Sequence, residues 1–280
     1  MARVYETVGN RCGCYSARMN DQVATHNTPP TVLHETKEWL VVNKPAGWHS
    51  VSRQVDKGEN DAAEQGERGE AAHGQTEISQ AKNSQAKKSQ TEISQTDHDQ
   101  SVQAWRERRE PTARSIPEAG LCHRLDQGTS GCLLIAKTLE AHERLRTAMG
   151  GADGAIAKTY LALVKGGLDK EGNFRLHFEG RYKRSAKVSV SRAGSWETGG
   201  RCKWKVLRHI VARGVDVVEV ELIGPGRRHQ IRAGFAYMEH PLEGDTLYGA
   251  PGPSHFSLHA WKIIIDGMTV TAPPPPRFVP

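Results

Sequence analysis

Residues 123–131 read HRLDQGTSG and bring a carboxylate, a guanidinium, an imidazole and two hydroxyl groups into one short stretch. Asp126 is the candidate nucleophile, because an ionised carboxylate can add to an electrophilic carbon or accept a proton. An apolar lead-in precedes it, a polar turn with glycines follows, and the apolar run CLLIA comes next. This pattern predicts a carboxylate on a loop that leads into a buried strand. If residues 123–126 are extended, Arg124 and Asp126 share the exposed face and Leu125 points into the core.

Two other interpretations of this stretch are open. Asp126 could cap the turn by accepting hydrogen bonds from the amides of Thr129 or Ser130. A serine hydrolase could use Ser130, His123 and Asp126, but the serine lacks the G-x-S-x-G turn, and three residues on one short loop are a poor source of triad geometry. We therefore set the hydrolase aside and expect His123 to hydrogen-bond within the fold.

Four more motifs follow the same order as in a known family. They are NKPAG at 43–47, KTY at 158–160, GRRHQIR at 226–232 and HPLEGDTLYG at 240–249. Together with HRLD and TSG they resemble the RluA family of RNA pseudouridine synthases. Several ordered motifs in one chain make the resemblance more specific than any single pattern. Ala233-Gly234 after HQIR departs from the family's usual pattern, and we expect it to loosen the helix there.

The resemblance implies an isomerase that acts on uridine in structured RNA, ribosomal or transfer, by base flipping and aspartate catalysis, with no metal or organic cofactor. It makes Asp126 the nucleophile, Arg232 its positioning partner, and Tyr160 the ring that stacks on the flipped base. Four further basic residues are expected to bind RNA: Lys44, Arg124, Arg227 and Arg228. For Lys44, a merely solvated side chain beside a Pro-Gly turn is an equal alternative. Ile231 and Leu242 could be apolar walls of the pocket or part of the core.

The rival function is a non-catalytic RNA-binding protein on the same scaffold. Such a protein would keep the arginines at 227, 228 and 232 but would not need Asp126. An Asp126→Asn substitution separates the two functions, because a binding protein tolerates it and an enzyme loses turnover.

The pattern of elements predicts an α+β fold with a mixed, largely antiparallel central sheet flanked by helices, because helices and strands alternate without a regular βαβ rhythm. Strands are expected in two short pieces within 32–42, at 132–136, at 156–164, in a series from 174 to 223, and at 263–265. Helices are expected from 105 until Pro111 breaks the helix, at 139–149 after an N-cap at Thr138, and at 227–237.

The domain prediction separates one catalytic domain from three flanking or inserted pieces. Residues 31–51 and 101–272 form the catalytic domain, 1–30 a flexible leader, and 273–280 a Pro-rich tail. Residues 52–100 are predicted to be a low-complexity, disordered insertion, because they hold too few large apolar residues to bury a face and contain four consecutive pentapeptides at 76–95.

Composition agrees with a nucleic-acid partner. The chain has 280 residues, a net charge of +6 and a pI near 9.1. Residues 52–100 carry six basic and ten acidic side chains, so the remainder is more basic, at +10. Five cysteines without an export signal predict reduced thiols, and Cys12, Cys14 and His26 lack the spacing of a metal site. No run of eighteen apolar residues occurs, so we do not expect the chain to enter a membrane. We expect a monomer that works in the cytoplasm.

Overall fold

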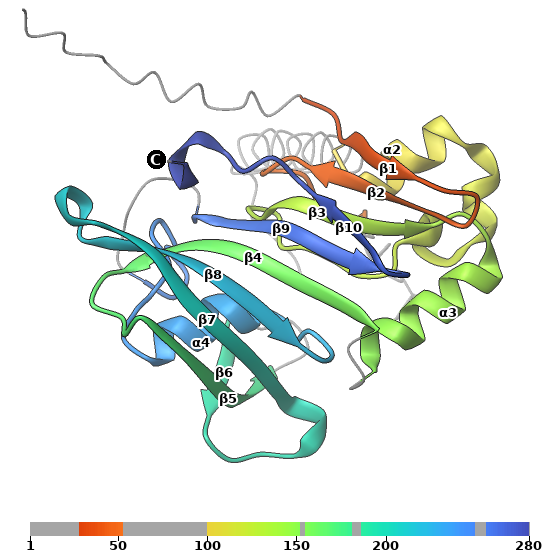
Figure 1. The fold of residues 1–280 in the computed structure, drawn as a ribbon. Helices are drawn as coiled ribbons and strands as arrows, with labels where there is room; N and C mark the ends of the chain where they lie inside the picture. Colours follow the sequence, from red (N-terminus) through yellow and green to blue (C-terminus); the bar gives the residue numbers. More distant parts are fainter. Residues whose placement is uncertain (1–27, 53–99, 152–154, 181–185, 250–255, 280) are drawn as a thin grey trace, which may run out of the picture.

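The computed structural model describes residues 28–52, 100–151, 155–180, 186–249 and 256–279. In these residues ten strands form one sheet in the order β1-β2-β3-β9-β4-β8-β7-β5-β6, and β10 pairs with the second half of β9 (Figure 1). The strands are β1 (Thr31–Glu35), β2 (Trp39–Lys44), β3 (Ser130–Ala136), β4 (Ile156–Lys165), β5 (Glu171–Gly180), β6 (Val188–Ser191), β7 (Gly199–Ile210), β8 (Val215–Ile223), β9 (Leu258–Ile265) and β10 (Met268–Thr271). Among them, β3 with β9 is the one parallel pair. The predicted α+β fold with a mixed, largely antiparallel sheet is confirmed.

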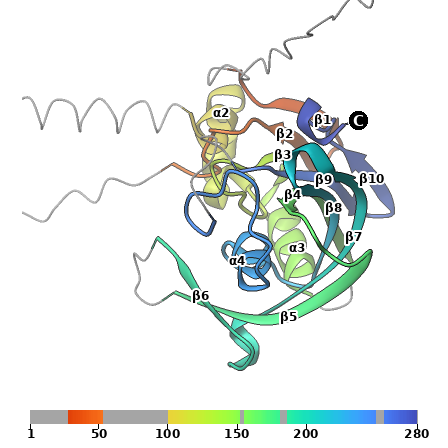
Figure 2. The ribbon, with the colours of Figure 1, turned by 90° about the vertical axis from the view of Figure 1, so that its left-hand side faces the viewer.

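Three α-helices flank the sheet in the part of the chain that the structure describes. They are α2 (Val102–Arg109), α3 (Leu139–Gly150) and α4 (Gln230–Tyr237). Short 3-10 helices are η1 (Pro111–Ser115), η2 (Pro117–Gly120), η3 (Trp196–Thr198), η4 (Val211–Arg213) and η5 (Pro276–Phe278). The sheet curves, and α4 lies in its hollow above β5 and β6 (Figure 2). No described helix has the length and apolar character needed to cross a bilayer.

Alternate residues of the central strands enter two different cores, as the period of a strand requires. On β2, Leu40 and Val42 pack in the core shared with α2 and α4, while Trp39 and Val41 pack in the core shared with α3. Strand β4, predicted at 156–164, alternates in the same way, with Tyr160, Ala162 and Val164 in the first core and Leu161 and Leu163 on the opposite face. The helices therefore cover both faces of one sheet.

Helix α2 starts earlier than the sequence pattern indicated. The side chain of Ser101 accepts a hydrogen bond from the amide of Ala104, which caps the helix before Val102. It ends before Pro111, as expected. The helix predicted at 139–149 is confirmed as α3, with the side chain of Thr138 as its N-cap.

Helix α4 begins at Gln230 instead of Arg227, which corrects the predicted start. His229 takes a left-handed conformation with φ of 54°, and this interrupts a right-handed helix. The Gln230 side chain accepts a hydrogen bond from the amide of Arg227 and donates one to the carbonyl of Arg201. Arg227 and Arg228 consequently lie in the loop between β8 and α4.

Gly234 tightens the packing of α4 and does not loosen it, contrary to our expectation. A Cβ atom at this position would lie 2.4 Å from Cζ of Phe174 on β5, so only glycine fits. The neighbouring Phe235 ring meets the rings of Phe174 and Trp204 at 5.8 and 5.7 Å between centroids. Helix α4 therefore packs closely against the sheet next to Arg232.

The domain limits are only partly visible. Residues 1–27 and 53–99, which hold most of the predicted leader and insertion, lie outside the described residues, as do Cys12, Cys14 and His26. The Pro-rich segment predicted to be a separate tail packs on the sheet instead, which corrects that prediction. Phe278 in η5 is buried against Leu161, Leu163 and Val217. The described residues up to 279 therefore belong to the folded unit.

Candidate active site

Ser50 fixes the loop that carries Asp126 through two hydrogen bonds to Leu125. The hydroxyl of Ser50 donates to the carbonyl of Leu125 and accepts from its amide, both at 2.9 Å. Leu125 is buried and Arg124 is exposed, as the extended pattern predicted. After the loop, Gly131 has φ of 108°, and a Cβ atom there would lie 2.2 Å from the carbonyl oxygen of Ala260. This glycine lets β3 approach β9 at the end where the site lies.

Arg232 pairs with Asp126, the partner that the resemblance implied. Its Nη1 donates to Oδ2 of Asp126 at 2.8 Å. Its Nε and Nη2 donate to both oxygens of the buried Asp245 at 2.7 and 3.0 Å. The turn after Asp126 is closed by the amide of Thr129, which donates to the main-chain oxygen of Asp126. The interpretation of this carboxylate as a turn cap is therefore wrong.

Two carboxylates share one guanidinium in this cluster, so Arg232 holds Asp126 without cancelling all of the negative charge. Burial alone would lower the pKa of Arg232, but the hydrogen bonds to Asp245 and Asp126 outweigh it and raise the pKa. The guanidinium also lies over the rings of Phe256 and Tyr248, at 4.0 and 5.4 Å from their centroids. The cation is therefore fixed in place.

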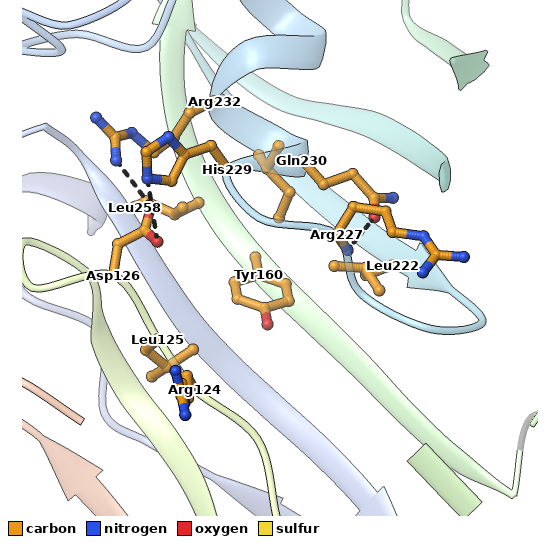
Figure 3. A pocket seen from close by; sticks show the side chains of 11 residues that line it. Arg124, Leu125, Asp126, Tyr160, Leu222, Arg227, His229, Gln230, Arg232 and Leu258 are labelled. Atoms are coloured by element: carbon orange, nitrogen blue, oxygen red, sulfur yellow. Dashed lines mark hydrogen bonds and ion pairs between the residues drawn. The ribbon is translucent and has the colours of Figure 1, made fainter. Parts of the chain in front are cut away.

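Tyr160 lies in the same pocket, on β4. The pairing of β4 with β9 shifts between Thr159 and Tyr160, and such irregularities change the direction of a side chain. Burial raises the pKa of Tyr160, so its phenol is neutral at neutral pH. Figure 3 shows its ring between the loop of Asp126 and the start of α4.

The pocket around these residues has a volume of about 70 Å³ and shares lining residues, among them Asp126 and Tyr160, with a groove of about 610 Å³. Apolar walls of the pocket include Leu125, Leu222 and Leu258 (Figure 3). Ile231 also lines it. Leu242, the other candidate wall, is instead buried in the core. The groove has two acidic residues, Glu118 and Asp126, and five basic ones: Arg124, Arg146, Lys158, Arg227 and Arg228. Its charge suits a polyanion.

Lys44 is not available to RNA, which corrects the prediction. The side chain is completely buried, and its Nζ donates to the carbonyls of Pro45, Trp48 and Gln127 at 3.0, 2.6 and 3.1 Å. Burial lowers the pKa of Lys44 to about 7, against the charge of Asp126, which raises it. Lys44 therefore ties the NKPAG turn to the loop of Asp126 from inside the fold.

The other three predicted RNA ligands lie along the groove. Arg124 is exposed and pairs with Glu118. Arg227 donates to the carbonyl of Gly199 at 2.9 Å, and Arg228 to that of Ala186 at 3.2 Å. Their contact with RNA stays a prediction.

The hydrolase alternative finds no support in the geometry. His123 accepts a hydrogen bond from the amide of Leu134 at 3.1 Å, and burial lowers its pKa to about 3. The hydroxyl of Ser130 pairs with His259 at 2.8 Å, and both side chains are buried. In the described part of the chain, no three histidine, cysteine or acidic side chains gather as metal ligands do.

Sequence reasoning missed four residues that build the site: His229, Asp245, Tyr248 and Phe256. The first three stand inside the motifs GRRHQIR and HPLEGDTLYG, so the motifs contained the signal without the roles. Phe256 stands in neither motif.

Fold and site point to one class, the pseudouridine synthases. The sequence model of the RNA pseudouridylate synthase family matches residues 38–237. Because this match covers most of the chain, the protein belongs to that family.

Curated relatives include "ribosomal large subunit pseudouridine synthase D" of Nitrosomonas europaea, 32% identical over 164 residues, which are 55% of this chain and 45% of the relative. The protein of the same name from Vibrio cholerae is 34% identical over 134 residues, 48% of this chain and 39% of its own. The alignments thus span less than half of these relatives. A solved structure, human RNA pseudouridylate synthase domain containing 1, matches with a TM-score of 0.59 and 20% identity over 89% of this chain and 86% of that one, and it supports the fold.

Proposed function

We propose that this protein converts uridine to pseudouridine in a structured RNA, with Asp126 as the catalytic carboxylate. The observation that carries the proposal is the Asp126 carboxylate, held by Arg232 at 2.8 Å in a pocket that also contains Tyr160. All three residues lie inside the region that the family model matches.

The reaction breaks the bond between N1 of uracil and C1′ of the ribose, turns the base, and joins C5 to C1′. N1 gains a proton and C5 loses one, so the electrons balance within the nucleotide and no oxidant, reductant or organic cofactor is required. Asp126 adds either to the sugar or to the base ring, and both routes need an ionised carboxylate with a free oxygen. Arg232 binds Oδ2, which leaves Oδ1 for this step.

The target base has to leave the RNA stack to reach this pocket, and the neutral ring of Tyr160 offers a surface on which it stacks. The basic groove next to the pocket would hold the flanking phosphates. Arg227 and Arg228 serve this purpose, and Arg124 contacts a phosphate or fills the gap that the flipped base leaves.

The names of the curated relatives make large-subunit ribosomal RNA the first substrate to test, with transfer RNA as the second. We propose a monomer that works in the cytoplasm, where both RNAs are made or used. The groove's charge, not any base-specific motif, supports an RNA partner.

Mapping of pseudouridine in total RNA tests the function and identifies the substrate together. Cells that lack the protein are compared with cells that carry wild type or Asp126→Asn. We expect one or a few sites to disappear without the protein and to return only with wild type. Sites restored equally by Asp126→Asn would favour the non-catalytic RNA-binding protein.

A further inference from the structure

His229 stands at the entrance to α4 with its ring turned toward Asp126 (Figure 3). Its side chain is only 11% exposed, and Nε2 lies 3.8 Å from Oδ1 of Asp126. Its φ of 54° is rare for a residue with a side chain, and such strained positions cluster at functional sites. This backbone conformation places the imidazole beside Oδ1 of Asp126, the oxygen that Arg232 does not bind.

A chain of hydrogen bonds leads from the main chain of Val188 through Tyr248 to the imidazole. The amide of Val188 donates to the hydroxyl oxygen of Tyr248 at 2.9 Å, and that hydroxyl lies 2.8 Å from Nδ1 of His229. Because the negative charge of Asp126 lies 3.8 Å from Nε2 and favours an N–H there, we assign the tautomer in which the phenol donates to Nδ1. Nδ1 is then an acceptor, and the ring proton is on Nε2.

The surroundings favour the neutral form of the ring. Burial lowers the pKa of His229, and the cations Arg232 and Arg228 act in the same direction, against the carboxylates of Asp126 and Asp245.

The Nε2 proton faces the pocket without a protein acceptor. At 3.8 Å the distance to Oδ1 of Asp126 is too long for a hydrogen bond, and among the described residues no other acceptor lies within reach of Nε2. The pocket therefore presents an unused donor and an unused carboxylate oxygen side by side.

We propose that His229 is a further catalytic residue, whose Nε2–H donates a hydrogen bond to a carbonyl oxygen of the flipped uracil. This rests on the proposed function. When the N1–C1′ bond breaks, its electron pair stays with the base and spreads to the carbonyl oxygens. Addition of Asp126 to the ring places negative charge on the same oxygens. On either route the donor stabilises charge that develops during the reaction.

Two substitutions at this position separate the donor from the fold. In His229→Gln the side-chain amide can reach the place of Nε2, whereas in His229→Asn it replaces Nδ1 and leaves the Nε2 position empty. We expect Asn to lower the single-turnover rate constant about 100-fold, the scale of one lost oxyanion donor, while Kd for the RNA stays within about threefold. Gln should keep the rate constant within about tenfold of wild type.

Tyr248→Phe keeps the ring beneath Arg232 but removes the hydroxyl that directs the proton. It should lower the rate constant in the wild-type background and change it less than about twofold in the His229→Asn background, since residues that act through one another are not additive.

The measurement uses the full chain and a transcript that contains the mapped uridine, with thermal unfolding of each variant as a check on the fold. A His229→Asn rate constant within about threefold of wild type would overturn the inference, and so would equal losses in Asn and Gln. If the wild type forms no pseudouridine on any RNA, the proposed function itself fails. If only the pattern among the variants is absent, the function stands and the role of His229 falls.

Discussion

At the scale of single residues, the arrangement of Asp245, Arg232 and Asp126 explains how a carboxylate can be both fixed and reactive. Asp245 is fully buried and also accepts hydrogen bonds from the amides of Leu247 and Tyr248. It takes two of the guanidinium's donors and leaves Nη1 for Asp126. Asp126 therefore receives a single hydrogen bond from Arg232, on Oδ2, and its Oδ1 accepts none from the guanidinium.

Asp245→Asn tests this division of charge. The variant leaves a buried guanidinium with one carboxylate, so Arg232 should bind Asp126 more closely and weaken it as a nucleophile. We expect the single-turnover rate constant to fall at least about tenfold and the free energy of unfolding to fall by about 1–3 kcal/mol. Glu38→Gln, which affects an exposed pair with Arg144, is the matched control and should change stability by less than about 1 kcal/mol. A single-turnover rate constant equal to that of wild type in Asp245→Asn would contradict the claim that Asp245 controls how Arg232 binds Asp126.

Lys158 gives a prediction for pH. It is buried in the groove wall with one carbonyl at 3.4 Å, and burial lowers its pKa from 10.5 to about 8. Between these values the unfolded chain binds a proton that the folded chain does not, so stability is lost as pH falls and gained as pH rises. Relative to Lys158→Met, the wild type should gain about 2 kcal/mol from about pH 7.5 to about pH 9.5, measured by urea unfolding. If the free energy of unfolding depended on pH in the same way in both proteins, the lowered pKa of Lys158 would be refuted.

At the scale of elements, α4 owes its position to the absence of a side chain at Gly234. Gly234→Ala should lower the free energy of unfolding by about 1–3 kcal/mol, because the added methyl group collides with Phe174. Gly150→Ala on α3 is the matched control, since a Cβ atom there meets nothing within 4 Å, and it should not destabilise. Equal unfolding temperatures for the two variants would show that α4 is not packed as described.

The sequence predicted the elements better than their junctions. Strand β4 and helix α3 follow from alternation and capping, which are local signals. The start of α4 could not be predicted, because the left-handed conformation of His229 depends on hydrogen bonds made by Gln230 to a distant strand. The burial of Lys44 also depends on a contact distant in sequence and could not be predicted. Two of its three carbonyl partners are in the adjacent turn, but the third is at residue 127.

At the scale of the whole molecule, the described residues on either side of 53–99 lie next to each other. His49 and Ser101 form a β-bridge, and the amide of Val102 donates to the carbonyl of His49 at 2.9 Å. Because the flanking residues already pair with each other, replacing residues 53–99 by a short Gly-Ser linker should leave the unfolding temperature within about 4 °C of wild type. A variant that fails to fold would show that the segment is part of the core.

The central claim is that Asp126 performs the chemistry, and the most direct measurement is a single-turnover assay on a transcript that carries the mapped uridine. Wild type and Asp126→Asn are compared for pseudouridine formation and, separately, for RNA binding. The account predicts a rate constant at least about a thousandfold lower in Asp126→Asn, with Kd within about threefold, because the amide keeps the shape and loses the nucleophile. A rate constant within about tenfold of wild type would contradict the account.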